Sequence, residues 1–505
     1  MSFDADLEEL AEAIGTQPPL IVTKDRDLGE LGDETLAALV GANDPAVIFR
    51  HAGTLARVVV DDDGAHLEPL SRTSLRGHLA RIATWVRPAR QGDGMVSACP
   101  SMEAVDDVLS QPSWPGLPPI ERVVSAPVFA PDGSLADQGG YHQAGRVWYE
   151  PGDLVVPAVP EHPSGEQVDA ARRMILDELL GEFPFVADAD KAHAVALLLA
   201  PFVRSLVTGP TPLHLIEAPS PGVGKGLLTE ALLLPALGRQ VTRMAEGRDE
   251  DEWRKRLTAG LLRGSAVALI DNLRLPLDSG ALAAAITAEV WEDRLLGRSE
   301  MVRARVRTVW AATGNNPVLS TEMARRSVRI RLDAGIERPW LRVGWRHPDL
   351  LAWATQGRGQ LVGAALTLVR AWLDAGRPDG RSSIGMFESW ARVLGGILEV
   401  AEVPGFLGNL SEFYAVSDGE GAALGGFVSS WWAVFGERSV AMADLWPVAD
   451  SSDLDLGSGG ERSQRIRLGK LIGAQRDRVV GDWRVVSAGD FRHTARWRLE
   501  PRRRP

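Results

Sequence analysis

Residues 213–233, LHLIEAPSPGVGKGLLTEALL, carry the strongest indication of fold, because their pattern predicts a strand, a glycine-rich turn and a helix in succession. Leu213–Glu217 is a short apolar run typical of a buried strand, and residues 226–237 have the pattern of a helix. Backbone N–H groups of such a turn can cradle phosphates, while a lysine at the helix start reaches the β- and γ-phosphate oxygens. We therefore expect ATP to bind at the following residues: Pro221, Gly222, Val223, Gly224, Lys225, Gly226 and Leu227.

The turn departs from the usual phosphate-loop pattern at two positions. Pro219 stands where a first glycine is usual, and Gly226 follows the lysine where a serine or threonine hydroxyl would bind Mg²⁺. A water molecule or another group must then fill that place. The alternative interpretation is an accidental Gly-Lys turn.

A second strand, in SAVALIDNL (residues 265–273), ends at a carboxylate. Asp271 at this position is expected to hold Mg²⁺ through water, about 45 residues after Lys225. Asn272 stands where a water-orienting glutamate is usual, and neither Glu289 nor Asp293 can be assigned that role from sequence. The alternative for Asp271 is a helix cap that follows a core strand.

A third strand, in VRTVWAATGNNP (residues 306–317), ends at Asn315, whose amide can position water or sense the γ-phosphate. The alternative is an Asx turn before Pro317. Next, STEMARRSVRIRLD (residues 320–333) places Arg325 and Arg326 before a strand. A guanidinium can stabilise a transferring phosphoryl group, also from a neighbouring subunit; the alternative is a solvated cluster. Strands that alternate with helices favour an α/β fold with a parallel sheet.

In this order, the motifs resemble those of the AAA+ ATPases of phage- and mobile-element-encoded replicative DNA helicases, which include superfamily-3 and poxvirus-type primase-helicases. The resemblance covers about residues 165–345. It implies a P-loop core with a helical lid, a homohexameric ring, ATP hydrolysis at subunit interfaces and movement on DNA. It also implies that Lys225, Asp271 and Asn315 act in cis and that Arg326, or else Arg325, acts in trans. Gly226 and Asn272 leave the Mg²⁺ and water geometry open.

Such ATPases carry a channel hairpin before the third strand, here within residues 291–310. Its candidate DNA contacts are Arg294, Arg298 and Arg303, because cationic side chains track phosphates without reading sequence. The alternative is a structural hairpin with exposed charges.

The C-terminal residues 461–505 carry thirteen Lys/Arg against five Asp/Glu, a net charge of +8 within a chain of −12. Two expected helices, 440–448 and 462–472, precede two strands, 478–486 and 491–500, which favours a winged helix. We expect Ile466, Leu468, Leu471 and Ile472 to form a core face. Alternation places Trp497 inward and suggests these DNA contacts: Arg462, Arg465, Arg492, Arg496 and Arg498. The alternative is a module that docks a protein.

Composition excludes several classes of protein. The 505 residues are 45% apolar and 24% charged, as in ordinary globular domains. The single cysteine, Cys99, excludes an intramolecular disulfide and a multi-cysteine metal site, and it favours the reducing cytoplasm. The longest apolar run, residues 194–203, is far short of the roughly 20 residues that a membrane span needs. The acidic N-terminus does not resemble a targeting signal. Trp340 and Trp345 are expected in packing roles.

We expect four regions: an α+β accessory domain (1–160), the ATPase core (161–345), a helical lid (346–432) and the winged helix (433–505). The expected function is an ATP- and Mg²⁺-dependent DNA helicase that replicates a phage, prophage or mobile element. Its expected partners are forked or single-stranded DNA, further copies of itself and a primase or initiator, without a membrane. The alternative is a regulatory AAA+ protein, such as a loader or defence component, that does not unwind DNA. A metabolic kinase explains neither the arginine pair nor the basic C-terminus.

Overall fold

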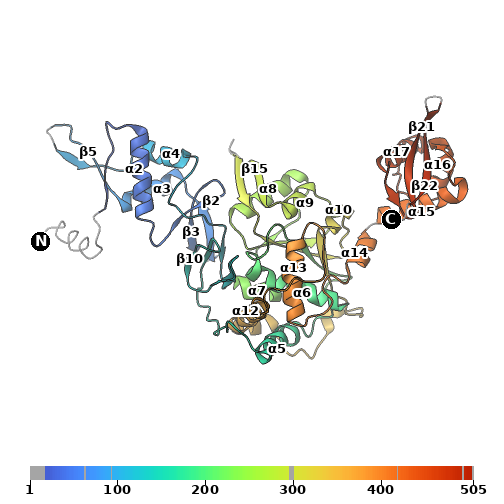
Figure 1. Cartoon of the computed structure of the whole chain (residues 1–505), viewed down its shortest axis with the longest axis horizontal. Coiled ribbons are helices and arrows are strands. Elements are labelled where there is room, and N and C mark those ends of the chain that lie inside the picture. Colours follow the sequence, from blue (N-terminus) through green and yellow to red (C-terminus); the bar gives the residue numbers. More distant parts are fainter. Residues whose placement is uncertain are drawn as a thin grey trace. The chain divides into compact units, whose positions relative to one another are not determined.

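The computed structural model describes residues 18–61, 64–91, 94–294, 301–417, 419–491 and 494–502. The chain divides into two compact units, which Figure 1 draws with their elements labelled. One unit comprises Met1–Pro317 with Arg326–Asn409, and the other comprises Val318–Arg325 with Leu410–Pro505. The chain has a mixed α/β fold that contains a parallel sheet. The four-region division made from the sequence stays a prediction.

A five-stranded parallel sheet forms the centre of the first unit, in the order β13-β14-β17-β12-β18. Its strands are β12 (Leu213–Ala218), β13 (Arg243–Met244), β14 (Val267–Leu273), β17 (Val309–Asn315) and β18 (Ser327–Arg331). Every residue of β12 is buried, as expected for a central strand that helices cover on both faces. Because all five strands run in parallel, their carboxyl ends meet at one edge of the sheet.

The helices of this unit include one at Lys225–Leu237, close to the predicted residues 226–237. They are α5 (Gly165–Arg173), a π-helical turn η1 (Met174–Leu179), α6 (Asp188–Val203), α7 (Lys225–Leu237), α8 (Glu250–Leu262), α9 (Gly280–Thr287), a 3₁₀ turn η2 (Pro339–Leu341), α11 (Leu350–Gln356), α12 (Arg358–Asp374) and α13 (Glu388–Val400). Residues 192–203 of α6 are buried on every side, because α6 packs between the sheet and the helices α7, α12 and α13. Two antiparallel strands, β15 (Val290–Arg294) and β16 (Met301–Arg305), form a hairpin that packs on α8.

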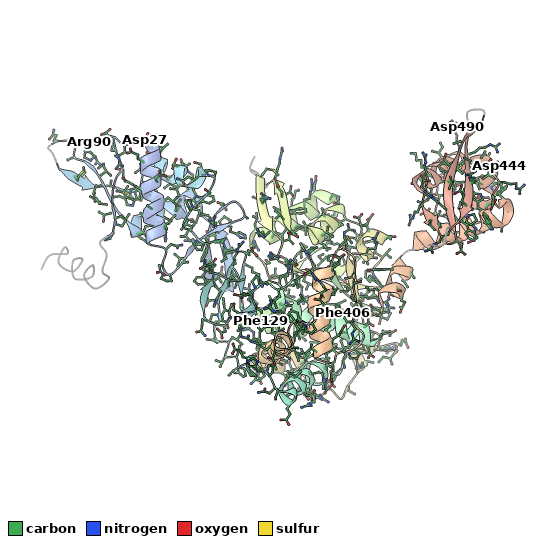
Figure 2. The ribbon with its side chains drawn as sticks, viewed as in Figure 1. Asp27, Arg90, Phe129, Phe406, Asp444 and Asp490 are labelled. Carbon is green, nitrogen blue, oxygen red and sulfur yellow. The ribbon has the colours of Figure 1, made fainter. Side chains whose placement is uncertain are left out.

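The interior of this unit also contains aromatic and imidazole rings. Phe406, labelled in Figure 2, lies edge-on to His193 and against Trp390, with centroid distances of 5.7 and 5.2 Å. Within the described residues, no helix combines the length and the apolar character that crossing a bilayer requires.

The N-terminal part of this unit consists of short helices and small sheets. Its elements are β1 (Leu20–Val22), α2 (Leu28–Gly41), β2 (Ile48–His51), β3 (Thr54–Asp61), β4 (Gly64–Pro69), α3 (Arg72–Ile82), β5 (Thr84–Pro88), β6 (Met95–Ser97), α4 (Met102–Ser110), β7 (Arg122–Val124), β8 (Val128–Phe129), β9 (Leu135–Ala136), β10 (Gly140–His142) and β11 (Val147–Tyr149). Two buried side chains join this part to the rest of the unit. The His51 Nε2 atom lies 3.1 Å from the carbonyl oxygen of Leu262, the last residue of α8. Arg122, which follows Ile120 and Glu121, donates to the Ser205 hydroxyl at 3.0 Å.

The second unit combines helices with a four-stranded antiparallel sheet, in the order β19-β22-β21-β20. Its elements are α10 (Thr321–Ala324), α14 (Leu410–Ser417), α15 (Gly419–Phe435), β19 (Val440–Ala441), α16 (Met442–Asp450), α17 (Glu461–Ala474), β20 (Val479–Val480), β21 (Trp483–Phe491) and β22 (Thr494–Pro501). Asp444, labelled in Figure 2, accepts the Ala441 N–H at 2.8 Å and so fixes the start of α16.

The core of the second unit agrees with the predicted pattern except at one position. Leu468, Ile472 and the inward-facing Leu499 of β22 are fully buried, and the inward-facing Trp497 is 9% exposed. The expectation for Ile466 is wrong, because that side chain is 54% exposed. Two residues along a helix correspond to a rotation of roughly 200°, which turns Ile466 away from the face that Leu468 shares with the core.

Candidate functional site

The glycine-rich turn between β12 and α7 has the geometry of an anion site. Gly222 and Gly224 adopt φ values of 82° and 110°, which favour glycine. Gly224 is the N-cap residue of α7, and no side chain caps the helix there. The first N–H groups of α7 are therefore left for an external acceptor. Val223 is buried and anchors the turn, whereas Pro221, Gly222, Gly226 and Leu227 are exposed.

Lys225 and Asn315 lie together at the carboxyl edge of the sheet. Asn315 is the last residue of β17, and Lys225 is the first residue of α7, which follows the turn after β12; β12 and β17 are neighbours, and Ala218 of β12 pairs with Asn315. The Lys225 Nζ donates to Asn315 Oδ1 at 2.5 Å. Burial lowers the pKa of the Lys225 ammonium, and the nearby Asp271 carboxylate partly opposes that shift. The structure thus brings together a lysine and an amide that are 90 residues apart in the sequence.

Asp271 reaches the same edge through a break in the pairing of its strand. The register of β14 against β17 shifts between Ile270 and Leu273, and Asn272 has a φ of 60°. Thr313 of β17 fixes the bulge, because its hydroxyl donates to Asp271 Oδ1 at 2.6 Å and accepts the Asn272 N–H at 2.8 Å. The bulge therefore orients the carboxylate by a defined contact to the neighbouring strand.

Two charged residues that the sequence did not predict, Arg243 and Glu230, also lie at the carboxyl edge of the sheet. Arg243 of β13 donates to Asp271 Oδ2 at 3.1 Å and to Glu230 Oε1 of α7 at 2.9 Å. The side chain of Glu230 is only 7% exposed. No local pattern marks either residue, because β13 has two residues and its contacts cross three elements. Asp293, considered as a water-activating acid, accepts instead from the Thr258 hydroxyl at 3.2 Å.

Arg326 lies at the opposite edge of the sheet from Lys225. Its carbonyl oxygen accepts the N–H of Leu213, the first residue of β12, whereas the glycine-rich turn follows the last residue of that strand. At a rise of about 3.3 Å per residue, the five steps along β12 separate the two ends by about 17 Å. Arg325 belongs to the second unit, where its N–H donates to the Thr321 carbonyl oxygen after α10. Within one chain, the structure does not bring Arg326 to Lys225.

The basic residues of the β15–β16 hairpin are exposed. Trp291 secures the hairpin by donating its Nε1 hydrogen to the Thr258 hydroxyl of α8 at 2.9 Å. Arg294 is the last residue of β15 and Arg303 lies within β16, and both side chains are exposed. Arg298, the third predicted contact, lies outside the described residues.

Acidic neighbours partly neutralise the basic face predicted for the second unit. Arg465 pairs with Glu461 at 2.5 Å, and its guanidinium lies 5.3 Å from the centre of the Trp446 ring. Arg498 pairs with Glu500 at 2.5 Å. Arg496 donates to the Ser439 carbonyl oxygen at 3.1 Å, and Arg462 is exposed. Arg492 lies outside the described residues.

Trp340 lies over the glycine-rich turn, which the sequence analysis did not anticipate. A Cβ atom added at Gly222 would lie 3.0 Å from Trp340 Cε3. Trp340 is 60% exposed and Trp345 is 39% exposed, so neither ring is buried in a core, and their expected packing role stays a prediction. They lie in a connection that follows β18, where no periodic pattern determines which side chains are buried.

The oxygen donors at the carboxyl edge of the sheet fit a magnesium site in which the protein supplies few ligands. Among the described residues, no group of three or more His, Cys, Asp or Glu side chains could hold a metal ion alone. Mg²⁺ is commonly bound through one or two carboxylates, with phosphate and water completing its shell. Asp271, beside the Thr313 hydroxyl and near Lys225, supplies a carboxylate of this kind.

No protein-family model matches the sequence, and no curated protein matches it. Solved structures with a similar arrangement include the apo C-terminal region of NrS-1, with a TM-score of 0.43 and 9% identity over 89% of this chain and 96% of that one. They also include the active helicase Cch of SCCmec type IV, with a TM-score of 0.36 and 10% identity over 90% and 93%. The JCV helicase matches with a TM-score of 0.23 and 14% identity over 50% and 66%.

Proposed function

We propose that this chain is an ATP-hydrolysing motor that moves along DNA as a ring, of the AAA+ type found in replicative helicases of phages and mobile elements. The observation that carries the proposal is the convergence of Lys225, Asp271 and Asn315 at the carboxyl edge of one parallel sheet. All three adjoin an uncapped glycine-rich turn. This combination supplies N–H donors, a cation and a carboxylate, which are the groups that a nucleoside triphosphate requires.

Each residue has a distinct role in this proposal. The turn Pro221–Leu227 cradles the phosphates, and the Lys225 ammonium contacts the terminal phosphates. Mg²⁺, when bound, neutralises phosphate charge, and Asp271 would hold it through water. Asn315 holds the attacking water or senses the terminal phosphate. When ATP binds, the terminal phosphate must displace the Asn315 amide oxygen from the Lys225 ammonium, which the oxygen contacts at 2.5 Å.

The position of Arg326 supports assembly into a ring. About 17 Å of strand separates it from the edge that carries Lys225, so it cannot serve the site of its own chain. A guanidinium that stabilises the transferring phosphoryl group must then come from a neighbouring copy. We propose a homohexamer in which Arg326, or else Arg325, completes the site of the next subunit.

DNA would contact two surfaces in this proposal. Arg294 and Arg303 on the hairpin, with Arg298, would track phosphates in the channel of the ring. The second unit would act as a winged helix, with Arg462, Arg465, Arg492, Arg496 and Arg498 as its contacts. The pairing of Arg465 and Arg498 with glutamates predicts that these two contribute less than Arg462.

Subunit mixing tests the shared site directly. We expect Lys225→Ala to abolish ATP hydrolysis, whereas Arg326→Ala should bind ATP normally and fail to hydrolyse it. Mixing the two inactive variants should restore activity, because some interfaces then combine an intact lysine with an intact arginine. Loss of ATP binding in Arg326→Ala, with no recovery on mixing, would contradict the trans role.

The second candidate is a regulatory AAA+ protein, a loader or a defence component, that does not unwind DNA. Gly226 and Asn272, in place of the usual hydroxyl and carboxylate, favour it because both substitutions remove groups that support rapid hydrolysis. A fork-unwinding assay run beside an ATPase assay separates the candidates. Hydrolysis stimulated by DNA without unwinding supports the second.

A further inference from the structure

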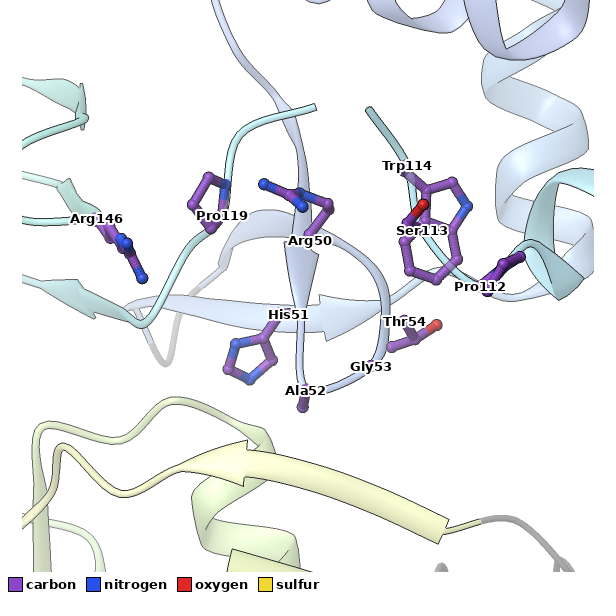
Figure 3. Close-up of a pocket in the computed structure, with 10 residues that line it drawn as sticks. All are labelled: Arg50, His51, Ala52, Gly53, Thr54, Pro112, Ser113, Trp114, Pro119 and Arg146. Carbon is purple, nitrogen blue, oxygen red and sulfur yellow. The ribbon is translucent and has the colours of Figure 1, made fainter. Parts of the chain in front are cut away.

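A cavity of about 360 Å³ opens in the N-terminal part of the first unit, away from the glycine-rich turn. Figure 3 shows Arg50 and Arg146 on either side of Pro119, with Trp114 on the far side of Arg50. The remaining wall includes Pro112 and the turn that joins β2 to β3. A volume of this size lies within the range of small-ligand sites.

Two arginines, Arg50 and Arg146, line the cavity, and further charged residues lie beside it. Glu121, two residues after Pro119, is shared by Arg146, Arg305 and Arg307 at 3.3, 3.7 and 2.9 Å. One carboxylate thus meets three guanidinium groups. Arg50 adds a fourth, and in the part of the chain that the structure describes it forms no ion pair, because its Nε donates to the Leu117 carbonyl oxygen at 2.8 Å.

The guanidinium groups that line the cavity are available to an anion. Arg50 and Arg146 are both exposed, and their remaining N–H donors form the planar fork that matches a phosphate group. Arg305 ends the strand β16 of the basic hairpin, so its contact with Glu121 links the rim to that hairpin. Positive charge is therefore present both at the hairpin, on Arg305, and at the cavity, on Arg146, with the shared Glu121 carboxylate between them.

The walls of the cavity determine what else the ligand carries. Pro112 is an exposed apolar surface and Pro119 is a half-buried one, whereas the Trp114 ring is only 5% exposed and is fixed in the core, where its Nε1 donates to the Val108 carbonyl oxygen at 2.6 Å. Such surfaces suit the flat face of a nucleobase. In a duplex the bases are paired and stacked, so only an unpaired nucleotide can enter a recess of this size.

We infer that this cavity is a binding site for single-stranded nucleic acid, in which Arg50 and Arg146 contact a phosphate and one unpaired base lies against the apolar wall. The inference deepens the proposed function, on which it rests, by assigning a strand-holding role to the N-terminal part. It differs from the channel contacts of the hairpin, which involve other side chains.

Fluorescence anisotropy with a fluorescein-labelled oligodeoxythymidine tests the site in the full chain. We expect Arg50→Ala and Arg146→Ala each to weaken binding roughly tenfold, because each removes a charge-assisted contact. The slope of log affinity against log salt should become shallower by about 0.7 for each arginine on a single strand. Arg90→Ala is the matched control, because Arg90, labelled in Figure 2, is an exposed arginine of the same part that does not line the cavity.

Two further arms separate the sources of phosphate. In the double variant, the affinity for a blunt duplex of the same length should fall less than the affinity for the single strand. Free dTMP should compete only weakly with the labelled oligonucleotide for the wild-type protein. Arg146→Ala is the variant less prone to disturb the fold, because Glu121 still pairs with Arg307 when Arg146 is removed. Arg50→Ala, in contrast, removes the hydrogen bond to the Leu117 carbonyl oxygen. Matching urea unfolding curves confirm that the variants are folded.

The inference is overturned by any of three results: a double variant that keeps the wild-type affinity and salt slope, an equal loss in Arg90→Ala, or full competition by dTMP. These results are distinguishable from a failure of the proposed function. If the wild-type protein binds no oligonucleotide, the proposed function fails. If it binds and the double variant binds equally well, only the cavity assignment fails.

Discussion

Replacing Thr313 by valine tests whether the bulge of β14 holds the carboxylate of Asp271 in its working orientation. The substitution keeps the shape of the side chain and removes the hydroxyl that contacts Asp271 Oδ1 at 2.6 Å and the Asn272 N–H at 2.8 Å. A hydrogen bond to a charged group contributes about 1.5–3 kcal/mol to stability. Asp271 is 26% exposed and Asn272 is exposed, so water compensates part of the loss. We expect the free energy of unfolding to fall by about 1.5 kcal/mol.

The same change should lower ATP turnover. A carboxylate that has lost its fixed contact spends less time in the orientation that holds the metal, and a cost of about 1.4 kcal/mol in the transition state reduces kcat roughly tenfold. The KM for ATP should change little, because the phosphates are bound by the glycine-rich turn and Lys225. Urea unfolding and steady-state ATPase kinetics measure the two effects.

Thr211→Val is the matched control. Thr211 is 2% exposed, and among the described residues its hydroxyl has no hydrogen-bond partner, so valine should be neutral or stabilising there and should leave kcat unchanged. If Thr313→Val and Thr211→Val have the same effect on unfolding, or if Thr313→Val leaves kcat intact, the bulge does not position Asp271.

Three further predictions concern the glycine-rich turn, the two histidines of the core and the second unit. Gly222→Ala should weaken ATP binding in a titration, because a Cβ at φ 82° is strained and would lie 3.0 Å from the Trp340 ring. Burial lowers the pKa of His193 to about 4 and that of His214 to about 3. Below pH 6.5 the two imidazoles therefore bind protons in the unfolded chain but stay neutral in the folded chain, so folding becomes less favourable. Urea unfolding at pH 5 should show a free energy of unfolding that is lower by about 2 kcal/mol for each histidine than at pH 7.5. Trp497→Ala should destabilise the second unit by about 3–5 kcal/mol, and a proteolysis time course should show that unit cleaved while ATP hydrolysis persists.

The strand, turn and helix at residues 213–237 could be predicted because the pattern is local. An apolar run, two glycines and a helical segment lie within 25 residues, and each limits the backbone without help from distant parts of the chain. The convergence of Lys225 and Asn315 followed from the rule that parallel strands share a carboxyl edge. Their direct contact could not be predicted, since it depends on which strands are neighbours.

Features that depend on contacts across strands were missed. The bulge at Asp271 requires the Thr313 hydroxyl on another strand, and Arg243 reaches Asp271 from a two-residue strand without a recognisable pattern. The pair of Glu461 and Arg465 is different, because a spacing of four residues on a helix is a readable signal of an ion pair. The spacing therefore indicates from the sequence that Arg465 is partly neutralised and contributes less to DNA binding.

Helix α8 has a consequence for how force could pass through the first unit. It carries the hairpin through the contact between Trp291 and Thr258, and its last residue, Leu262, meets His51 of the N-terminal part. This single helix of 13 residues thus contacts the hairpin at Thr258 and the N-terminal part at Leu262. A tilt of α8 would therefore displace the hairpin and the cavity wall at His51 together. A movement of the hairpin along DNA would in this way be transmitted directly to the cavity in which we infer that single-stranded nucleic acid binds.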